Sequence, residues 1–151
     1  MSHTLSQLMQ FIEENDIKFI RLAFCDMFGV QKNIAIMASQ LPHAVESGIS
    51  FDASAIAGFA NVAESDLFLA PDLDTFAILP WRPSEGCVGR FFCNIKYPDG
   101  RPFEGDGRWL LGQLEQRALR QGYSFLVGPE CEFYLFETDE KGRPTHTPFD
   151  E

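Results

Sequence analysis

The order in which helical and strand-like patterns follow one another constrains the fold of this chain more strongly than any single motif. Apolar residues recur at the spacing of one helix face over residues 4–14, which predicts a helix there. Strand-like runs follow at residues 18–24 and 30–37, and a turn-forming segment at residues 26–29 separates them. A helix, a hairpin and further short strands in this order predict a small mixed α+β domain.

The next stretch predicts a second short helix and then a segment without a clear period. Ser39 is a suitable helix cap, Pro42 is tolerated in a first helical turn, and Gly48 can end the helix. Residues 49–65 carry many small side chains and predict a functional or interface loop. The further strand-like runs in this part of the chain are residues 67–69, 76–79 and 87–95.

The pattern changes after the turn signal Pro98-Asp99-Gly100. Asp106 can cap a helix that carries leucines on one side, and Gly122 can terminate it. Residues 124–137 alternate well enough for a strand, and the polar segment 139–144 is followed by no further predicted element. One helix and one strand cannot enclose a core, so this second unit is predicted to be incomplete.

Composition argues against nucleic-acid and membrane binding. Of 151 residues, 45% are apolar and 23% are charged, and the formal net charge is -10 without any basic cluster. No apolar run approaches the length of about 20 residues that crosses a bilayer, and the polar-faced helix expected over residues 1–15 predicts that no signal peptide precedes the fold. The four cysteines form no Cys-x-x-Cys pair and have no histidine at ligand spacing, which predicts reduced thiols in a cytoplasmic protein without a zinc site.

Two carboxylates two residues apart are the sharpest local signal. Glu130 and Glu132 would project from one face of the predicted strand, because side chains alternate along a strand. On a buried face their pKa values would rise unless a divalent cation such as Mg²⁺ or Mn²⁺ neutralised them. A solvated outer strand face is the commoner origin of a Glu-x-Glu pattern, so both interpretations stay open on the residues alone.

A third carboxylate, Asp52, lies in the segment of small residues. An aspartate there could bind a cation or deprotonate an amine, or it could cap a turn by accepting hydrogen bonds from backbone N–H groups. No Ser-His-Asp, Cys-His or glycine-rich phosphate-loop pattern occurs. A nucleotide site would therefore have to be built from other elements or from further chain.

Several short motifs follow one another in a fixed order between residues 17 and 137. They are Phe24-Cys25-Asp26-Met27-Phe28-Gly29, Phe51-Asp52-Ala53-Ser54-Ala55-Ile56, Glu64-Ser65-Asp66, Leu79-Pro80-Trp81, Phe103-Glu104-Gly105-Asp106-Gly107-Arg108 and Gly128-Pro129-Glu130-Cys131-Glu132-Phe133. Their order resembles that of the class I glutamine synthetase family. The family usually has Gly and Ser where this chain has Ala53 and Ala55, and a common Pro is replaced by Gly107. These departures bear on the amine substrate more than on the fold.

The resemblance implies an α+β fold made of three parts. Residues 1–16 would form an amino-terminal helix, residues 17–103 a β-grasp domain, and residues 104–151 an incomplete beginning of the catalytic domain. It also implies that Asp52 helps to bind ammonium and take its proton, and that Glu130 and Glu132 each hold a divalent ion, Mg²⁺ or Mn²⁺. Family members form stacked rings, typically dodecamers, in which neighbouring subunits share each active site.

The implied function is ATP-dependent ligation of ammonia to glutamate, which forms glutamine. ATP phosphorylates the side-chain carboxylate of glutamate, and ammonia then displaces the phosphate. The isolated chain is expected to be inactive, because most of the catalytic domain is missing. Two alternatives remain: a γ-glutamyl-amine ligase of the same family that uses a polyamine or another amine, and a non-catalytic β-grasp interaction module.

Overall fold

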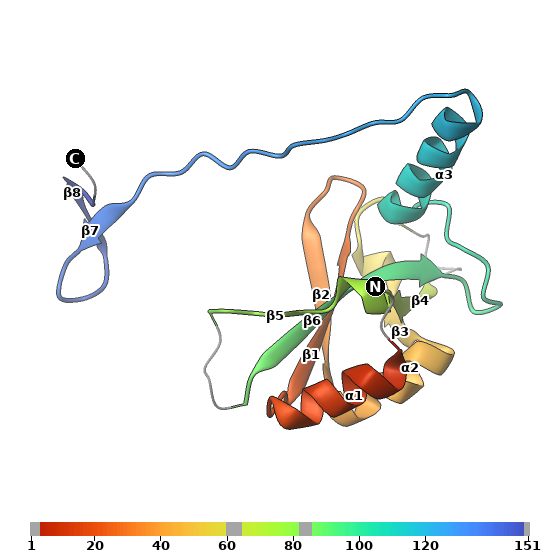
Figure 1. Cartoon of the computed structure of the whole chain (residues 1–151), viewed down its shortest axis with the longest axis horizontal. Coiled ribbons are helices and arrows are strands. Elements are labelled where there is room, and N and C mark those ends of the chain that lie inside the picture. The colour runs from red at the N-terminus through yellow and green to blue at the C-terminus, as the bar shows by residue number, and fades with distance from the viewer. Residues whose placement is uncertain (1–3, 60–64, 82–85, 150–151) are drawn as a thin grey trace.

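The structure, a computed structural model, describes residues 4–59, 65–81 and 86–149 and gathers most of its elements around one curled sheet (Figure 1). The helices are α1 (Leu5–Glu14), α2 (Leu41–Ser47) and α3 (Gly107–Arg120). The strands are β1 (Phe19–Cys25), β2 (Gln31–Met37), β3 (Ile49–Asp52), β4 (Asp66–Pro71), β5 (Ala77–Ile78), β6 (Val88–Lys96), β7 (Phe136–Thr138) and β8 (Pro144–Pro148). Among the described residues, no helix is long and apolar enough to cross a membrane.

The strand order of the main sheet is β2-β1-β6-β4-β3, with β5 paired to β6. The central strands β1 and β6 are parallel, with Arg21 opposite Arg90. The outer pairs are antiparallel, and Asp52 of β3 lies opposite Asp66 of β4. The parallel central pair requires a long crossover between β1 and β6, and this crossover contains β2, α2 and the edge strand β3.

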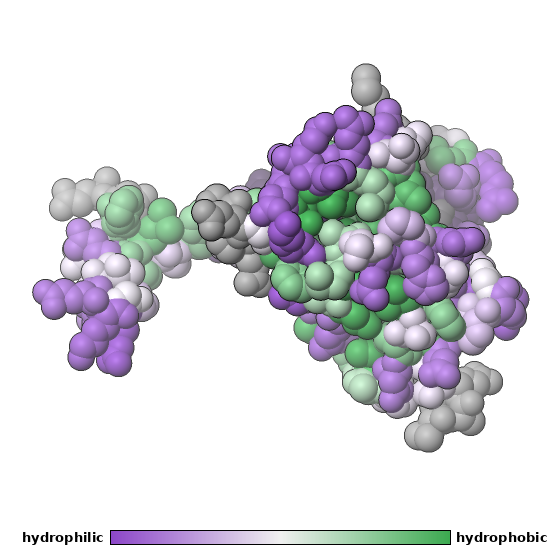
Figure 2. Space-filling view, turned by 90° about the horizontal axis from the view of Figure 1, so that it is seen from below, coloured by the Kyte–Doolittle hydropathy of each residue, from purple (hydrophilic) through white to green (hydrophobic). Residues whose placement is uncertain are grey.

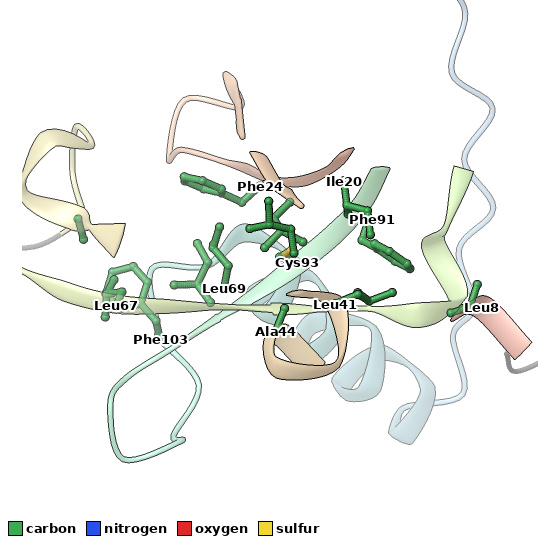
Figure 3. Packing of buried hydrophobic residues seen from close by; sticks show 14 of the residues in the cluster. Leu8, Ile20, Phe24, Leu41, Ala44, Leu67, Leu69, Phe91, Cys93 and Phe103 are labelled. Carbon is green, nitrogen blue, oxygen red and sulfur yellow. The ribbon is translucent and has the colours of Figure 1, made fainter. Parts of the chain in front are cut away.

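The helices α1 and α2 cover one face of the sheet and enclose the core. Alternation along each strand sends every second side chain to this face, which buries Leu22 of β1 and Phe91 of β6. The buried cluster includes Leu8, Ile12, Ile20, Leu22, Phe24, Leu41, Ala44, Leu67, Leu69, Phe91, Cys93 and Ile95 (Figure 3). Each large side chain buried here contributes about 1.5–3 kcal/mol to folding, so this core stabilises the sheet that carries the edge strand β3.

Local signals begin and end several elements where the sequence predicts. Thr4 forms a capping box with Gln7 at the start of α1, as expected for a helix over residues 4–14. Asp26 is buried in the β1–β2 turn, where its carboxylate accepts the N–H groups of Phe28 and Val30 at 2.9 Å each. Gly48 ends α2 with φ 76°, a conformation that glycine adopts without strain.

The predicted cap at Ser39 is wrong. Ser39 lies inside a short 3-10 helix, Ala38–Gln40, which runs directly into α2, and Gln40 is the N-cap residue. Ser39 is therefore already part of a helical turn, whereas a cap residue lies just before one. Pro42 does lie in the first turn of α2, as predicted.

The predicted loop over residues 49–65 is only partly correct, because its first four residues form β3. This strand pairs with β4, which is distant in sequence, and a run of four residues gives too weak a period to be recognised alone. Residues 53–55 follow as a short 3-10 helix. Residues 60–64, which include Glu64 of the Glu-Ser-Asp motif, lie outside the described residues.

The predicted strand over residues 124–137 is wrong for most of its length. Only Phe136–Thr138 pair, with β8, although residues 123–135 run through space as a single extended segment (Figure 1). A strand needs a neighbour for its N–H and C=O groups, and no other described strand lies beside these residues. The polar segment 139–144 forms the β7–β8 turn, so the chain does continue into a further element, β8.

Candidate functional site

Asp52 is the last residue of the edge strand β3 and the cap of the short 3-10 helix Ala53–Ala55. Its Oδ1 accepts hydrogen bonds from the Ser54 hydroxyl at 2.6 Å and from the Ser54 backbone N–H at 2.9 Å. The turn-capping interpretation of Asp52 is therefore confirmed. Capping uses one carboxylate oxygen, and the side chain remains exposed to solvent.

The two hydrogen bonds from Ser54, the hydroxyl bond first, lower the pKa of Asp52 below its ordinary value of 3.8. Asp52 is therefore ionised at neutral pH and can attract a small cation. A carboxylate with a lowered pKa is also a weaker proton acceptor. The bonds from Ser54 thus stabilise the ionised form of Asp52.

The segment around Asp52 is anchored to the core more firmly than its small residues suggest. The Ala53 methyl group is fully buried, and the Ala53 N–H donates to the Ser65 carbonyl at 2.6 Å. Phe59 is also buried, with its ring centroid 5.3 Å from that of Phe103. Ala53 therefore fits this backbone, and Asp52 projects from a supported edge.

Glu130 and Glu132 lie apart from this edge. Both are exposed on the extended segment that leads away from the sheet (Figure 1), so the solvated interpretation of the pair describes this structure, although the two residues do not lie on a strand. Carboxylate oxygens suit Mg²⁺ or Mn²⁺, but two are too few to replace most of a hydration shell. The described residues contain no group of three or more His, Cys, Asp or Glu side chains placed to hold a metal ion.

A buried carboxylate, Asp106, connects the start of α3 to the sheet. Its Oδ1 accepts the Arg108 N–H at 3.0 Å, which confirms the predicted helix cap. Its Oδ2 accepts the N–H of Ile95 in β6, also at 3.0 Å. Burial raises the pKa of Asp106, and the N–H donors partly offset this effect.

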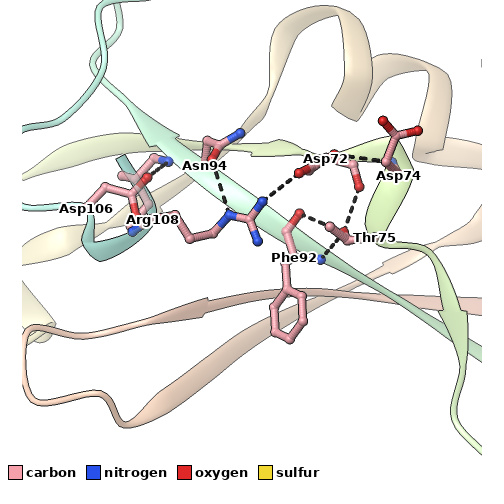
Figure 4. Close-up of polar contacts among 8 residues, drawn as sticks. Asp72, Asp74, Thr75, Phe92, Asn94, Asp106 and Arg108 are labelled. Atoms are coloured by element: carbon pink, nitrogen blue, oxygen red, sulfur yellow. Dashed lines mark hydrogen bonds and ion pairs between the residues drawn. The ribbon is translucent and has the colours of Figure 1, made fainter. Parts of the chain in front are cut away.

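A second link runs from Arg108 to the segment after β4 (Figure 4). The Arg108 guanidinium donates to the Asp72 carboxylate at 2.5 Å and to the Asn94 side-chain oxygen at 3.3 Å. Asp72 also caps the short 3-10 helix Leu73–Thr75 through the Asp74 N–H. Sequence reasoning missed this network, because nothing in the local pattern indicates that Arg108 reaches Asp72.

Comparison with known families and structures complements this geometry. The family described as "Glutamine synthetase, beta-Grasp domain" matches residues 16–98, more than half of the chain. The chain belongs to the glutamine synthetase family. The curled sheet with α1 and α2 on one face is thus a glutamine synthetase β-grasp domain, as the motif order predicts.

Relatives in the family are glutamine synthetases and are much longer than this chain. The glutamine synthetase of Clostridium saccharobutylicum is 50% identical over 143 residues, which cover 95% of this chain and 32% of the relative. The glutamine synthetase of Methanosarcina mazei is 46% identical over 142 residues, which cover 94% of this chain and 32% of that relative. The chain thus spans about a third of the length of these relatives.

Solved structures show the same fold. The cryo-electron microscopy structure of Plasmodium falciparum glutamine synthetase superposes with a TM-score of 0.70 at 21% identity, over 81% of this chain and 24% of that one. A structure of GmaS in complex with ADP superposes with a TM-score of 0.68 at 27% identity, over 80% of this chain and 26% of the GmaS chain. These similarities extend the fold assignment to most of the chain.

Proposed function

We propose that the protein containing this chain is an ATP-dependent glutamate–ammonia ligase that forms glutamine. In this proposal the chain provides Asp52 for binding ammonium, together with two of the carboxylates that bind metal. Support comes from membership of the glutamine synthetase family and from the two relatives described above, which are named glutamine synthetases. Residues 104–151 would belong to the catalytic domain, which requires further chain.

The observation that carries the proposal is the state of Asp52. Its carboxylate is exposed, ionised at neutral pH as any aspartate of ordinary or lowered pKa is, and held in place by Ser54. An ammonium ion is a compact cation with several N–H donors, and a carboxylate oxygen left free by the turn can accept one of them. Asp52 would concentrate ammonium at the sheet edge and orient it, and other groups would assist the loss of its proton.

Glu130 and Glu132 are proposed to hold Mg²⁺ or Mn²⁺ together with ligands from further chain. A divalent ion bound there would neutralise charge on the transferring phosphoryl group. Use of ATP is supported by the structure of GmaS with ADP, a protein 27% identical to this chain over the aligned part. The described residues alone would not complete either a nucleotide site or a metal site.

Self-association into rings is part of the same proposal, with neighbouring subunits completing each site. The described second unit exposes several large apolar side chains, as expected for surfaces that other chain segments or subunits cover (Figure 2). They include Leu111, Leu114, Phe125, Leu126, Val127, Phe133 and Tyr134. A cytoplasmic location also remains a proposal.

Ammonia is preferred to larger amines as the nucleophile, because the relatives are named glutamine synthetases. The comparisons do not favour the γ-glutamyl-amine ligase or the non-catalytic module. The test is an assay of the complete protein with Mg²⁺, ATP and glutamate, in which ammonium, methylamine and putrescine are compared. We expect kcat/KM for ammonium to exceed that for either amine by at least about tenfold. A higher kcat/KM for an amine, or no ADP formation with any of the three, would refute the proposal.

A further inference from the structure

The uncovered face of the main sheet contains a pocket of about 400 Å³ over β2, β1 and β6. This volume is within the range of small-molecule sites. Alternation along the strands places Arg21 and Arg90 on this face, opposite the buried Leu22 and Phe91. Asp52 lies on β3, which β4 separates from the strands under the pocket.

The two arginines lie side by side. Arg21 and Arg90 are register partners on the parallel strands β1 and β6, which places their Cα atoms about 5 Å apart. Neither guanidinium forms an ion pair with a carboxylate among the described residues, and no Asp or Glu is among the residues that line the pocket. The chain as a whole has 22 acidic and 12 basic residues, so this local excess of positive charge runs against its overall balance.

Arg90 has an unused hydrogen-bond donor. Its guanidinium carbon lies 3.8 Å from the centroid of the Phe92 ring, which fixes the plane of the group. Its Nη1 is buried and has no hydrogen-bond partner among the described residues. A buried donor without a partner is unfavourable, and an arriving acceptor would relieve this cost.

Arg21 is positioned beside it with donors to spare. Its Nη1 donates to the Asn33 side-chain oxygen on β2 at 3.0 Å, which holds the side chain over the sheet. A guanidinium has five N–H donors, so one bond to Asn33 leaves the others available. Guanidinium groups carried on adjacent strands repel one another, and an anion bound by both would relieve this repulsion.

Another part of the pocket lining is apolar and can contact the carbon atoms of a ligand. Trp81, Leu79 and Phe92 line the pocket beside the two arginines. An inorganic ion would use only the charged part of this surface, whereas a small organic anion would use both parts. Arginine pairs with planar carboxylates and with phosphates through two parallel N–H bonds.

We propose that this pocket binds a small organic anion. The carboxylate or phosphate group of the ligand lies between Arg21 and Arg90, where it accepts the unused Nη1–H of Arg90. Its carbon skeleton lies against Trp81 and Phe92. This site is independent of the ligase proposal, because it rests only on the arrangement of this sheet face.

The test is calorimetric titration of the complete protein with succinate and, separately, with glycerol 3-phosphate. At least one of them should bind saturably, and the comparison shows whether the preferred group is a carboxylate or a phosphate. Arg90→Gln and Arg21→Gln should each raise the Kd for that anion at least about tenfold. Arg90→Lys keeps the charge but loses the planar fork, so it should also weaken binding.

Arg101→Gln is the matched control, because Arg101 is exposed and lies outside the pocket, where it pairs with Asp99. It removes the same charge and should leave the Kd unchanged. Thermal unfolding of every variant checks that the fold is retained. Quenching of Trp81 fluorescence, identified by its loss in Trp81→Phe, locates the bound anion. Absence of saturable binding by both anions, or binding that Arg101→Gln weakens as much as Arg90→Gln, would overturn the proposal.

Discussion

At the scale of single residues, Asp106 links α3 to the sheet with one buried carboxylate. Asp106→Asn keeps the size of the side chain, but its amide has one acceptor oxygen for two N–H donors. The amide nitrogen would then face either the Ile95 N–H or the Arg108 N–H. We expect the free energy of unfolding to fall by about 1–3 kcal/mol. Urea unfolding measures this, with Asp99→Asn in an exposed turn as the control, and an equal loss in both variants would contradict it.

Asp52 gives a second prediction at this scale, concerning its pKa. The lowered pKa means that the stability contributed by ionised Asp52 is present above its ordinary value of 3.8 and is lost as pH falls through the folded value. Ser54→Ala removes the hydroxyl donor, so the pKa of Asp52 should rise toward that ordinary value. A pH titration of the side-chain carboxyl carbon by NMR measures the shift. The pKa of Asp99, which Arg101 lowers, should stay the same, and an unchanged pKa at Asp52 would show that the hydroxyl bond is absent.

At the scale of elements, Gly48 connects α2 to β3 and thereby sets the course of the strand that ends at Asp52. Its backbone has φ 76° and ψ 171°, and an added Cβ would lie 3.2 Å from both the Leu69 carbonyl oxygen and the Phe68 Cβ. Gly48→Ala should lower the free energy of unfolding by about 1–3 kcal/mol. Gly112→Ala in α3 meets no atom within 4 Å and should be neutral or stabilising. Thermal unfolding compares the two, and equal effects would contradict the account.

Elements with their own period or local cap could be predicted from the sequence. Apolar spacing indicates α1, and Asp106 indicates the start of α3. The edge strand β3 was missed because its identity depends on pairing with β4, a contact that a four-residue run does not reveal. The strand predicted at residues 124–135 is wrong for the opposite reason. Their alternation is suitable for a strand, but this chain supplies no neighbour for it.

The candidate site likewise contains features that the local sequence predicts and features that depend on contacts between distant residues. Asp52 could be singled out by its motif. Its role in the turn could also be predicted, because aspartate side chains commonly accept hydrogen bonds from backbone N–H groups in turns. The link from Arg108 to Asp72 joins residues 36 positions apart, and no local pattern contains it. The pairing of Arg21 with Arg90 likewise needs the parallel register of β1 and β6.

At the scale of the whole molecule, the β-grasp domain is followed by α3 and by an extended segment that no other described element covers. The exposed leucines of α3 and the unpaired segment after it have no core of their own among the described residues. The 151-residue chain should therefore form no glutamine from Mg²⁺, ATP, glutamate and ammonium. It should also bind Mn²⁺ only weakly, since Glu130 and Glu132 supply too few ligands. Calorimetry that showed tight Mn²⁺ binding abolished by Glu132→Ala would contradict this, as would turnover above a Glu130→Ala, Glu132→Ala control.

The role of Asp52 in the complete protein is the central claim, and steady-state kinetics of Asp52→Asn test it most directly. The amide keeps the size and an acceptor for Ser54 but removes the negative charge that attracts ammonium. Amide formation with ammonia should fall by at least about 100-fold, while thermal unfolding and assembly stay close to those of the unchanged protein. A purely turn-capping Asp52 predicts near-normal turnover instead, because asparagine caps a turn about as well as aspartate. Unchanged ammonia kinetics in a well-assembled Asp52→Asn protein would contradict the account.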